Sequence, residues 1–177
     1  MSDEATPVVS EKTERELLLE KIVPPHTVRS VEVTENMIDI VVKDGQTMLD
    51  ICFSGNGIYP SAYAVAHSQI EEKKPLRFFA HRNGMLVCNP VITRKTSHPV
   101  DSEEGCITYG YHTMINVPRS HKIEVDFQTI IDDDDGKKTL SSVFHESLSG
   151  RDAKIFQHEI DHMDGTYIYE GSNTPQK

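Results

Sequence analysis

The sequence lacks long apolar runs, and this absence narrows the class of protein. None of its apolar stretches approaches the roughly 20 residues that a membrane-spanning helix needs. The segment from Met1 to Glu16 is charged and polar, without the apolar core of a secretory signal peptide. We therefore expect a cytoplasmic protein that does not associate with membranes. An organellar location remains open.

Cysteine is scarce and irregularly placed. The three residues are Cys52, Cys88 and Cys106, an odd number with no C-x-x-C spacing. This pattern fits a reducing compartment better than a disulfide framework. Each cysteine can be explained as a small buried apolar residue. Cys106 alone has a sequence neighbourhood that suggests a further role.

Positive charge is also in short supply. The chain has 18 Lys and Arg against 28 Asp and Glu, which gives a net charge of -10. Proteins that bind nucleic acid usually carry a basic face, and no long run of Lys or Arg occurs here. We therefore expect no direct nucleic-acid binding. The length of 177 residues suits a single domain, and a monomer is the default expectation.

The apolar pattern predicts an α+β domain, with helices at its two ends and strands between them. We expect a disordered leader over residues 1–12, the folded domain over residues 13–170 and a flexible tail over residues 171–177. An Asn83-Gly84 pair predicts a hairpin. The predicted elements are helices over Thr13–Ile22 and Glu35–Ser54, strands over Leu76–Ala80, Met85–Cys88, Cys106–Thr108, Met114–Val117 and Ile123–Ile131, and a last helix that is capped by Ser147 or Ser149 and ends at Gly165.

The last predicted helix carries an H-E-x-x-H motif. His158 and His162 are four residues apart, so a helix places both on one face, where they can hold one metal ion. Glu159 lies beside the first ligand, where a carboxylate can take a proton from a water on that metal. A surface helix with two hydrogen-bonded histidines and a solvated glutamate would give the same pattern.

A catalytic site of this kind generally has a third protein ligand. Downstream of the motif, Ile168 occupies the position where one class of zinc protease has its third histidine, and Glu170 lies only eight residues past His162. Upstream, Cys106 follows Gly105 at the start of a predicted strand. A thiolate with two imidazoles is a reasonable ligand set for Fe(II) or Zn(II). The upstream cysteine is therefore the better candidate.

At these residues the chain closely resembles peptide deformylase. That family carries E-G-C-[LI]-S and H-E-x-D-H, and this chain has Glu104-Gly105-Cys106-Ile107-Thr108 and His158-Glu159-Ile160-Asp161-His162. The family's third motif, G-x-G-L-A-A-x-Q, matches Ala62 to Gln69. The resemblance covers about Ile22 to Glu170 and also includes Asn89-Pro90, Val117-Pro118-Arg119, Gln157 and Gly165.

The resemblance implies a metal-dependent hydrolase that removes the formyl group from N-formylmethionyl peptides of nascent proteins, with possible contact to the ribosome. It implies a single domain of mainly antiparallel sheets around the metal-binding helix, in a bacterium or a phage-infected host. The implied metal is Fe(II), with Zn(II), Ni(II) or Co(II) as alternatives. The implied residues are Cys106, His158 and His162 as ligands, Glu159 as general base and acid, Gln69 and the backbone N–H of Ile107 as oxyanion donors, and Gly105, Ala64, Val65 and Ile155 as substrate-binding residues.

Two departures from the family leave alternatives open. Both glycines of the third motif are alanine, as Ala62 and Ala64, and His67 stands where alanine is usual. Lys154 lies one helical turn before His158, where the family usually has an apolar residue. A zinc endopeptidase with a different third ligand, or a catalytically weakened metal-binding homologue, therefore remains an alternative.

Overall fold

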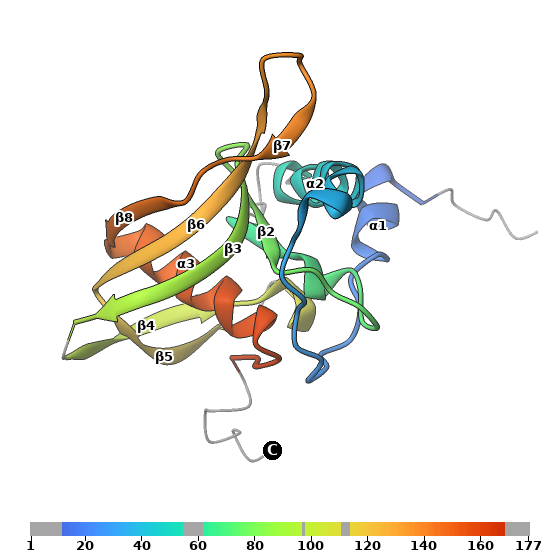
Figure 1. The fold of residues 1–177 in the computed structure, drawn as a ribbon. Coiled ribbons are helices and arrows are strands. Elements are labelled where there is room, and N and C mark those ends of the chain that lie inside the picture. Colours follow the sequence, from blue (N-terminus) through green and yellow to red (C-terminus); the bar gives the residue numbers. More distant parts are fainter. Residues whose placement is uncertain (1–11, 55–61, 97, 111–113, 169–177) are drawn as a thin grey trace, which may run out of the picture.

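The computed structural model describes residues 12–54, 62–96, 98–110 and 114–168. Within these residues, three α-helices and eight strands follow the chain as drawn in Figure 1. The helices are α1 (Glu14–Leu19), α2 (Ile38–Phe53) and α3 (Gly150–Met163), with 3-10 turns at Glu35–Met37, His67–Gln69 and Ile107–Tyr109. The strands are β1 (Ala64–Ala66), β2 (Phe78–His81), β3 (Leu86–Lys95), β4 (Pro99–Gly105), β5 (Met114–Ser120), β6 (Lys122–Asp132), β7 (Lys138–Leu140) and β8 (Phe144–Ser149).

The strands form one large sheet and one small one. The large sheet has the order β1-β2-β3-β6-β7, and β8 also pairs with β6. The small sheet consists of β4 and β5. Every pairing between these strands is antiparallel. The predicted α+β class, with mainly antiparallel sheets and a C-terminal helix packed on them, is confirmed.

The large sheet is packed between α2 and α3 (Figure 1). Successive residues of a strand point to opposite faces, and β2 shows the result. Phe78 lies in the core cluster with Val41 and Met48 of α2, whereas Phe79 lies in the cluster with Phe156 of α3. The sheet thus has an apolar core on both faces, and α3 is held rigidly against one of them.

Gly45 is the residue that weakens the sequence prediction of α2, because glycine in a helix interior is unfavourable. The helix nevertheless continues through it. A Cβ at this position would lie 2.6 Å from Cδ1 of Leu86. Close packing between α2 and the start of β3 therefore explains the glycine.

The predicted hairpin is present. Gly84 has φ +94°, a value that L-residues rarely adopt, and the turn connects β2 to β3. The strand predicted over Ile123–Ile131 is also confirmed, as part of β6, and its alternate residues Ile123, Val125 and Phe127 are buried. These two features fix the centre of the large sheet.

Several element predictions are wrong. The predicted strand over Cys106–Thr108 is instead a 3-10 turn over Ile107–Tyr109, closed by hydrogen bonds from the N–H groups of Tyr109 and Gly110 to the carbonyls of Cys106 and Ile107. Cys106 therefore follows a strand, β4, rather than opening one. Ser149 occupies the N-cap of α3, but its side chain makes no capping hydrogen bond. The strands β1, β4, β7 and β8 were not predicted.

The predicted tail, and the predicted leader except its last residue, lie outside the described residues. Among the described helices, none is both long and apolar enough to cross a membrane.

Candidate metal centre

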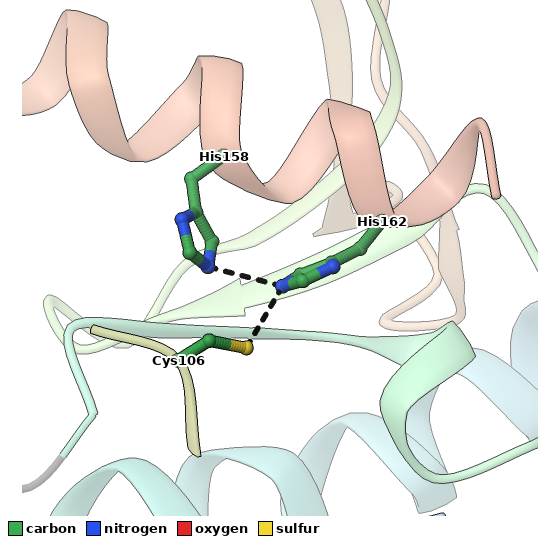
Figure 2. Close-up of side chains that lie close together, drawn as sticks. All are labelled: Cys106, His158 and His162. Carbon is green, nitrogen blue, oxygen red and sulfur yellow. Dashed lines mark hydrogen bonds between the residues drawn. The ribbon is translucent and has the colours of Figure 1, made fainter. Parts of the chain in front are cut away.

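Three side chains converge beside α3. Nε2 of His162 lies 3.0 Å from Nε2 of His158 and 3.3 Å from Sγ of Cys106 (Figure 2). Their potential ligand atoms all lie within 4.8 Å of one another, and all three residues are buried. The helix supplies the two imidazoles one turn apart, as the spacing predicts. The thiol comes from 52 residues upstream of His158, at the end of β4.

The backbone around Cys106 is fixed on both sides. Gly105, the last residue of β4, pairs with Met114 of β5. The 3-10 turn over Ile107–Tyr109 follows immediately. The sulfur is therefore presented from a short connection between a strand and a turn.

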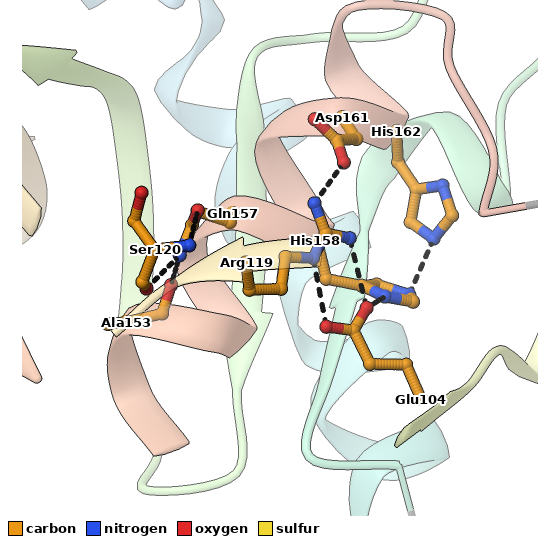
Figure 3. Close-up of polar contacts among 8 residues, drawn as sticks. All are labelled: Glu104, Arg119, Ser120, Ala153, Gln157, His158, Asp161 and His162. Atoms are coloured by element: carbon orange, nitrogen blue, oxygen red, sulfur yellow. Dashed lines mark hydrogen bonds and ion pairs between the residues drawn. The ribbon is translucent and has the colours of Figure 1, made fainter. Parts of the chain in front are cut away.

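A buried ionic network orients His158 (Figure 3). Nδ1 of His158 lies 2.9 Å from Oε2 of Glu104. Arg119 binds both carboxylate oxygens of Glu104 at 2.9 Å and also contacts Asp161. Burial opposes ionisation of Glu104, but the hydrogen bonds from His158 and Arg119 outweigh it and lower the pKa to about 2. The carboxylate is therefore charged and accepts the proton on Nδ1, which leaves Nε2 of His158 free to bind a metal.

A second contact anchors the same helix to β5. The amide of Gln157 accepts from the backbone N–H of Ser120 at 3.0 Å and donates to its carbonyl at 2.9 Å (Figure 3). Gln157 also donates to the carbonyl of Ala153. The Gln157 amide thus bonds both backbone groups of Ser120, as a residue of a neighbouring strand would. This pair of hydrogen bonds fixes the position of α3 along its axis relative to β5.

The donor set fits a divalent cation. Two imidazole nitrogens and a thiol sulfur within 4.8 Å of one another are ligand atoms that one such ion can share. Burial holds the pKa of His162 well below its usual range, so this imidazole is neutral, as a metal ligand must be. Burial opposes a charge on His158 too, but Cys106 and Glu104 raise its pKa to about 10, so the surroundings favour a cation here.

Glu159 lies at the same centre with one oxygen uncommitted. Its side chain is buried, and Oε2 has no hydrogen-bond partner among the described residues. Burial raises the pKa of Glu159 to about 7. The residue lines a cavity of about 490 Å³ that Cys106 and His158 also line. A buried carboxylate with one free oxygen, in a cavity beside a candidate metal site, is placed to handle protons.

The comparison with known proteins settles the family. The family model for polypeptide deformylase matches residues 27–177. The chain belongs to the polypeptide deformylase family. It is therefore a metal-dependent hydrolase, and the zinc-endopeptidase alternative is not favoured.

Relatives support this assignment over most of the chain. The peptide deformylase of Thermus thermophilus is 31% identical over 145 residues, which cover 75% of this chain and 70% of that protein. The structure of peptide deformylase from Thermotoga maritima has a TM-score of 0.63 at 23% identity and covers 90% of this chain and 93% of its own. The structure of the deformylase of the Vibrio parahaemolyticus bacteriophage VP16T, in complex with actinonin, has a TM-score of 0.60 at 26% identity. The match covers 82% of this chain and 95% of the phage protein.

Gln69 of this deformylase points its amide nitrogen at the centre. Its Oε1 accepts from the backbone N–H of Ala66 at 2.9 Å, which fixes the orientation of the amide. Its Nε2 then lies 3.0 Å from Oγ1 of Thr108 and 3.5 Å from Sγ of Cys106. The side-chain amide therefore donates to Thr108 and to Cys106, one of the three candidate ligands.

The predicted substrate-binding residues divide into two groups. Ala64, Gly105, Ile107 and Ile155 line the cavity. Val65 does not, because its fully buried side chain packs in the core cluster on the α2 side of the sheet. Ala64 and Val65 are successive residues of β1, so their side chains point to opposite faces of the sheet.

The departures in the third motif cause no backbone strain. Asn89 is the only non-glycine residue with positive φ among the described residues, so Ala62 and Ala64 do not need glycine's freedom. His67 is buried, accepts from the backbone N–H of Leu76 at 2.8 Å and lies 3.2 Å from Asp44. This deformylase thus replaces a small residue with a hydrogen-bonded one.

Sequence reasoning missed part of the polar lining of the cavity. Arg151, Glu103 and His121 line it, together with Tyr63 and the already noted Lys154. The signal for Arg151 was available, because it precedes His158 by seven residues, two helical turns. No sequence signal connects His121 to the site, since it lies between β5 and β6.

Proposed function

We propose that this deformylase hydrolyses the N-terminal formyl group of N-formylmethionyl peptides from nascent proteins. Cys106, His158 and His162 would hold one divalent ion in this reaction. The observation that carries the proposal is the convergence of three buried donor atoms near Glu159, whose Oε2 has no hydrogen-bond partner among the described residues, at the wall of a cavity. The reaction adds water across the formyl C–N bond and yields formate and a free amine.

The proposed metal is Fe(II), with Zn(II), Ni(II) or Co(II) as alternatives that one thiolate and two imidazoles also suit. When bound, such an ion supplies Lewis acidity, which makes water more acidic and polarises a carbonyl group. The network of Glu104 and Arg119 would keep the His158 imidazole oriented toward it.

We assign the proton transfers to Glu159. Its Oε2 would take a proton from the attacking water and later give one to the leaving amine nitrogen, first as general base and then as general acid. Glu104, the other buried carboxylate near the ligands, is paired with Arg119 and is therefore less suited to this role.

We assign the stabilisation of the developing oxyanion to Gln69 and to the backbone N–H of Ile107. The bond from Ala66 holds the Gln69 amide before substrate arrives, so its donors need no reorganisation during the reaction. Removing one such donor typically costs about 3 kcal/mol of transition-state stabilisation.

The peptide would bind as an added strand. Ala64 in β1 and Gly105 in β4 both line the cavity. Among the described strands, β1 pairs only with β2 and β4 pairs only with β5, so each has one edge without a strand partner. An extended peptide can use such an edge for backbone hydrogen bonds. Ile155 of α3 would then contact its side chains.

The substrate class also fixes the proposed setting. Formylated nascent chains emerge at the ribosome, so we propose that the protein acts on them there, in the cytoplasm. We also propose that it acts as a monomer. The net charge of -10 gives no support to direct nucleic-acid binding.

Formate release tests the function. Protein purified without oxygen and loaded with Fe(II) should release formate from formyl-Met-Ala-Ser, and Glu159→Ala should lose this activity while it retains the metal. Normal metal content without formate from the parent protein would support the weakened homologue instead. Cleavage of internal peptide bonds by the loaded protein would support an endopeptidase.

A further inference from the structure

The cavity face of α3 carries two cations upstream of the metal ligands. Arg151 and Lys154 precede His158 by seven and four residues and line the same cavity. At 1.5 Å per residue, they lie about 10 Å and about 6 Å from His158 along the helix axis. A line of positive charge therefore leads from the cavity mouth toward the metal centre.

Neither cation has an acidic partner within the part of the chain that the structure describes. Among the described residues, Arg151 and Lys154 make no ion pair. Arg151 is instead held over the ring of Tyr63, with its Cζ 5.1 Å from the ring centroid. Arg82 lies over the same ring at 5.2 Å. A guanidinium held by an aromatic face keeps its N–H donors available for an anion.

The other wall of the cavity runs in the same direction. Ser102 to Gly105 of β4 line it opposite α3 and lead to Cys106. A peptide that extends from the metal centre along β4 advances about 3.3 Å per residue. Its second and third residues would therefore lie about 7 to 10 Å from the centre, level with Lys154 and Arg151.

The carboxylates that line this cavity form no ion pair with Arg151 or Lys154 among the described residues. Glu104 is bound by Arg119, and Glu159 is buried at the ligands. Glu103 is exposed and makes no ion pair among the described residues. A cationic stretch in an active-site cavity of a protein with net charge -10 points to an anionic group on the substrate.

We propose that Arg151 and Lys154 select formylmethionyl peptides with an acidic side chain at the second or third residue. This inference rests on the proposed deformylase function and adds its sequence preference. Lys154 would act with its ammonium group, and its alkyl stem would still cover apolar surface near the methionine side chain. The first residue would remain methionine.

Isosteric peptide pairs test the proposal. The substrates are formyl-Met-Asp-Ala and formyl-Met-Ala-Asp, each compared with its Asn counterpart, and all are C-terminal amides so that no terminal carboxylate competes. We expect kcat/KM to be about fivefold higher for at least one Asp peptide, the factor for a charge pair worth about 1 kcal/mol. The ratio should fall as ionic strength rises, because salt screens exposed charges.

Variants then assign the preference to residues. Arg151→Gln with Lys154→Met should bring the Asp/Asn ratio close to one, whereas Glu103→Gln should raise it. Arg94→Gln is the matched control, because Arg94 is an exposed cation on β3 that lies outside the cavity. Its ratio should equal that of the parent.

The outcomes separate the two hypotheses. Equal rates on Asp and Asn peptides overturn the preference and leave the deformylase function intact. Absence of formate from every peptide counts against the function. In that case, calorimetric binding of the same peptides to the metal-loaded Glu159→Ala variant decides the preference, and equal Kd values for Asp and Asn overturn it.

Discussion

Replacing Arg119 by Met tests whether the buried ionic network tunes the metal site. The side chains of Arg119 and Glu104 are only 6% and 9% exposed, so the substitution leaves a buried carboxylate without its bidentate partner. Removing one member of such a pair typically destabilises a protein by about 3–5 kcal/mol. Urea unfolding of the metal-free protein would measure this loss.

The same variant should bind metal more weakly. Loss of a group that orients a metal-binding histidine usually costs about 10- to 100-fold in affinity. Here Arg119 acts through Glu104, which receives the Nδ1 proton of His158. Competition between the protein and a chromophoric chelator for Zn(II) would give the Kd. Arg119→Lys is the matched variant, since it keeps the charge but not the two-pronged contact.

A double variant separates orientation from stability. Glu104→Leu with Arg119→Leu removes both buried charges, so much of the lost stability should return. Metal affinity should stay low, because Nδ1 of His158 still lacks its acceptor. If Arg119→Met is destabilised yet binds Zn(II) as tightly as the parent, the network only supports packing and the reasoning is refuted.

Three further predictions concern other parts of the structure. Gln69→Ala should lower kcat by about 10²- to 10³-fold with little change in metal content, since it removes one proposed oxyanion donor; an unchanged kcat in single-turnover assays would contradict this role. Gly165→Ala should destabilise the protein by more than about 1 kcal/mol, because φ is +77° and the new Cβ would lie 2.5 Å from the carbonyl oxygen of Thr27. Gly136→Ala has a similar φ of +75° but meets nothing within 4 Å, so it should cost less in the same urea titration, and equal costs would show that the contact is irrelevant. Burial lowers the pKa of His67 in the folded protein, so its contribution to stability is fully present above about pH 6.5 and is lost as pH falls toward the lowered value. His67→Ala should therefore show a shallower loss of unfolding free energy below pH 6.5, by up to about 1.4 kcal/mol per pH unit, and identical slopes would refute a neutral buried imidazole.

The convergence of the three candidate metal ligands was predictable because it depends on short sequence patterns. His158 and His162 are fixed relative to one another by helical periodicity alone. Cys106 required a second motif, since no local rule connects it to His158, which lies 52 residues further along the chain. The geometry unites the three residues, although the predicted local structure around Cys106 was wrong.

The strand β4 was not predictable from its residues. Its sequence includes Asp101-Ser102-Glu103-Glu104, and Asp and Glu are depleted in strands. Burial does alternate, with Ser102 and Glu104 inside, but the inward residues are polar. Glu104 can be buried only because Arg119, on the partner strand β5, neutralises it. A pattern based on hydrophobicity cannot detect a strand whose buried side chain is held by a distant charge.

The altered third motif shows how a departure from a family pattern can be accommodated. Position 67 carries histidine where the family usually has alanine. Burying the polar ring atoms of His67 would destabilise the fold unless those atoms formed hydrogen bonds. Leu76 donates its backbone N–H to Nδ1 of His67, which leaves the proton on Nε2 to bond Asp44 of α2, and the ring stacks on Phe78 at 4.8 Å. Gln69 lies in the same 3-10 turn as His67, so the contacts of His67 also help to position the proposed oxyanion donor. The turn is therefore tied to α2 as well as to the sheet, and the change need not weaken the site.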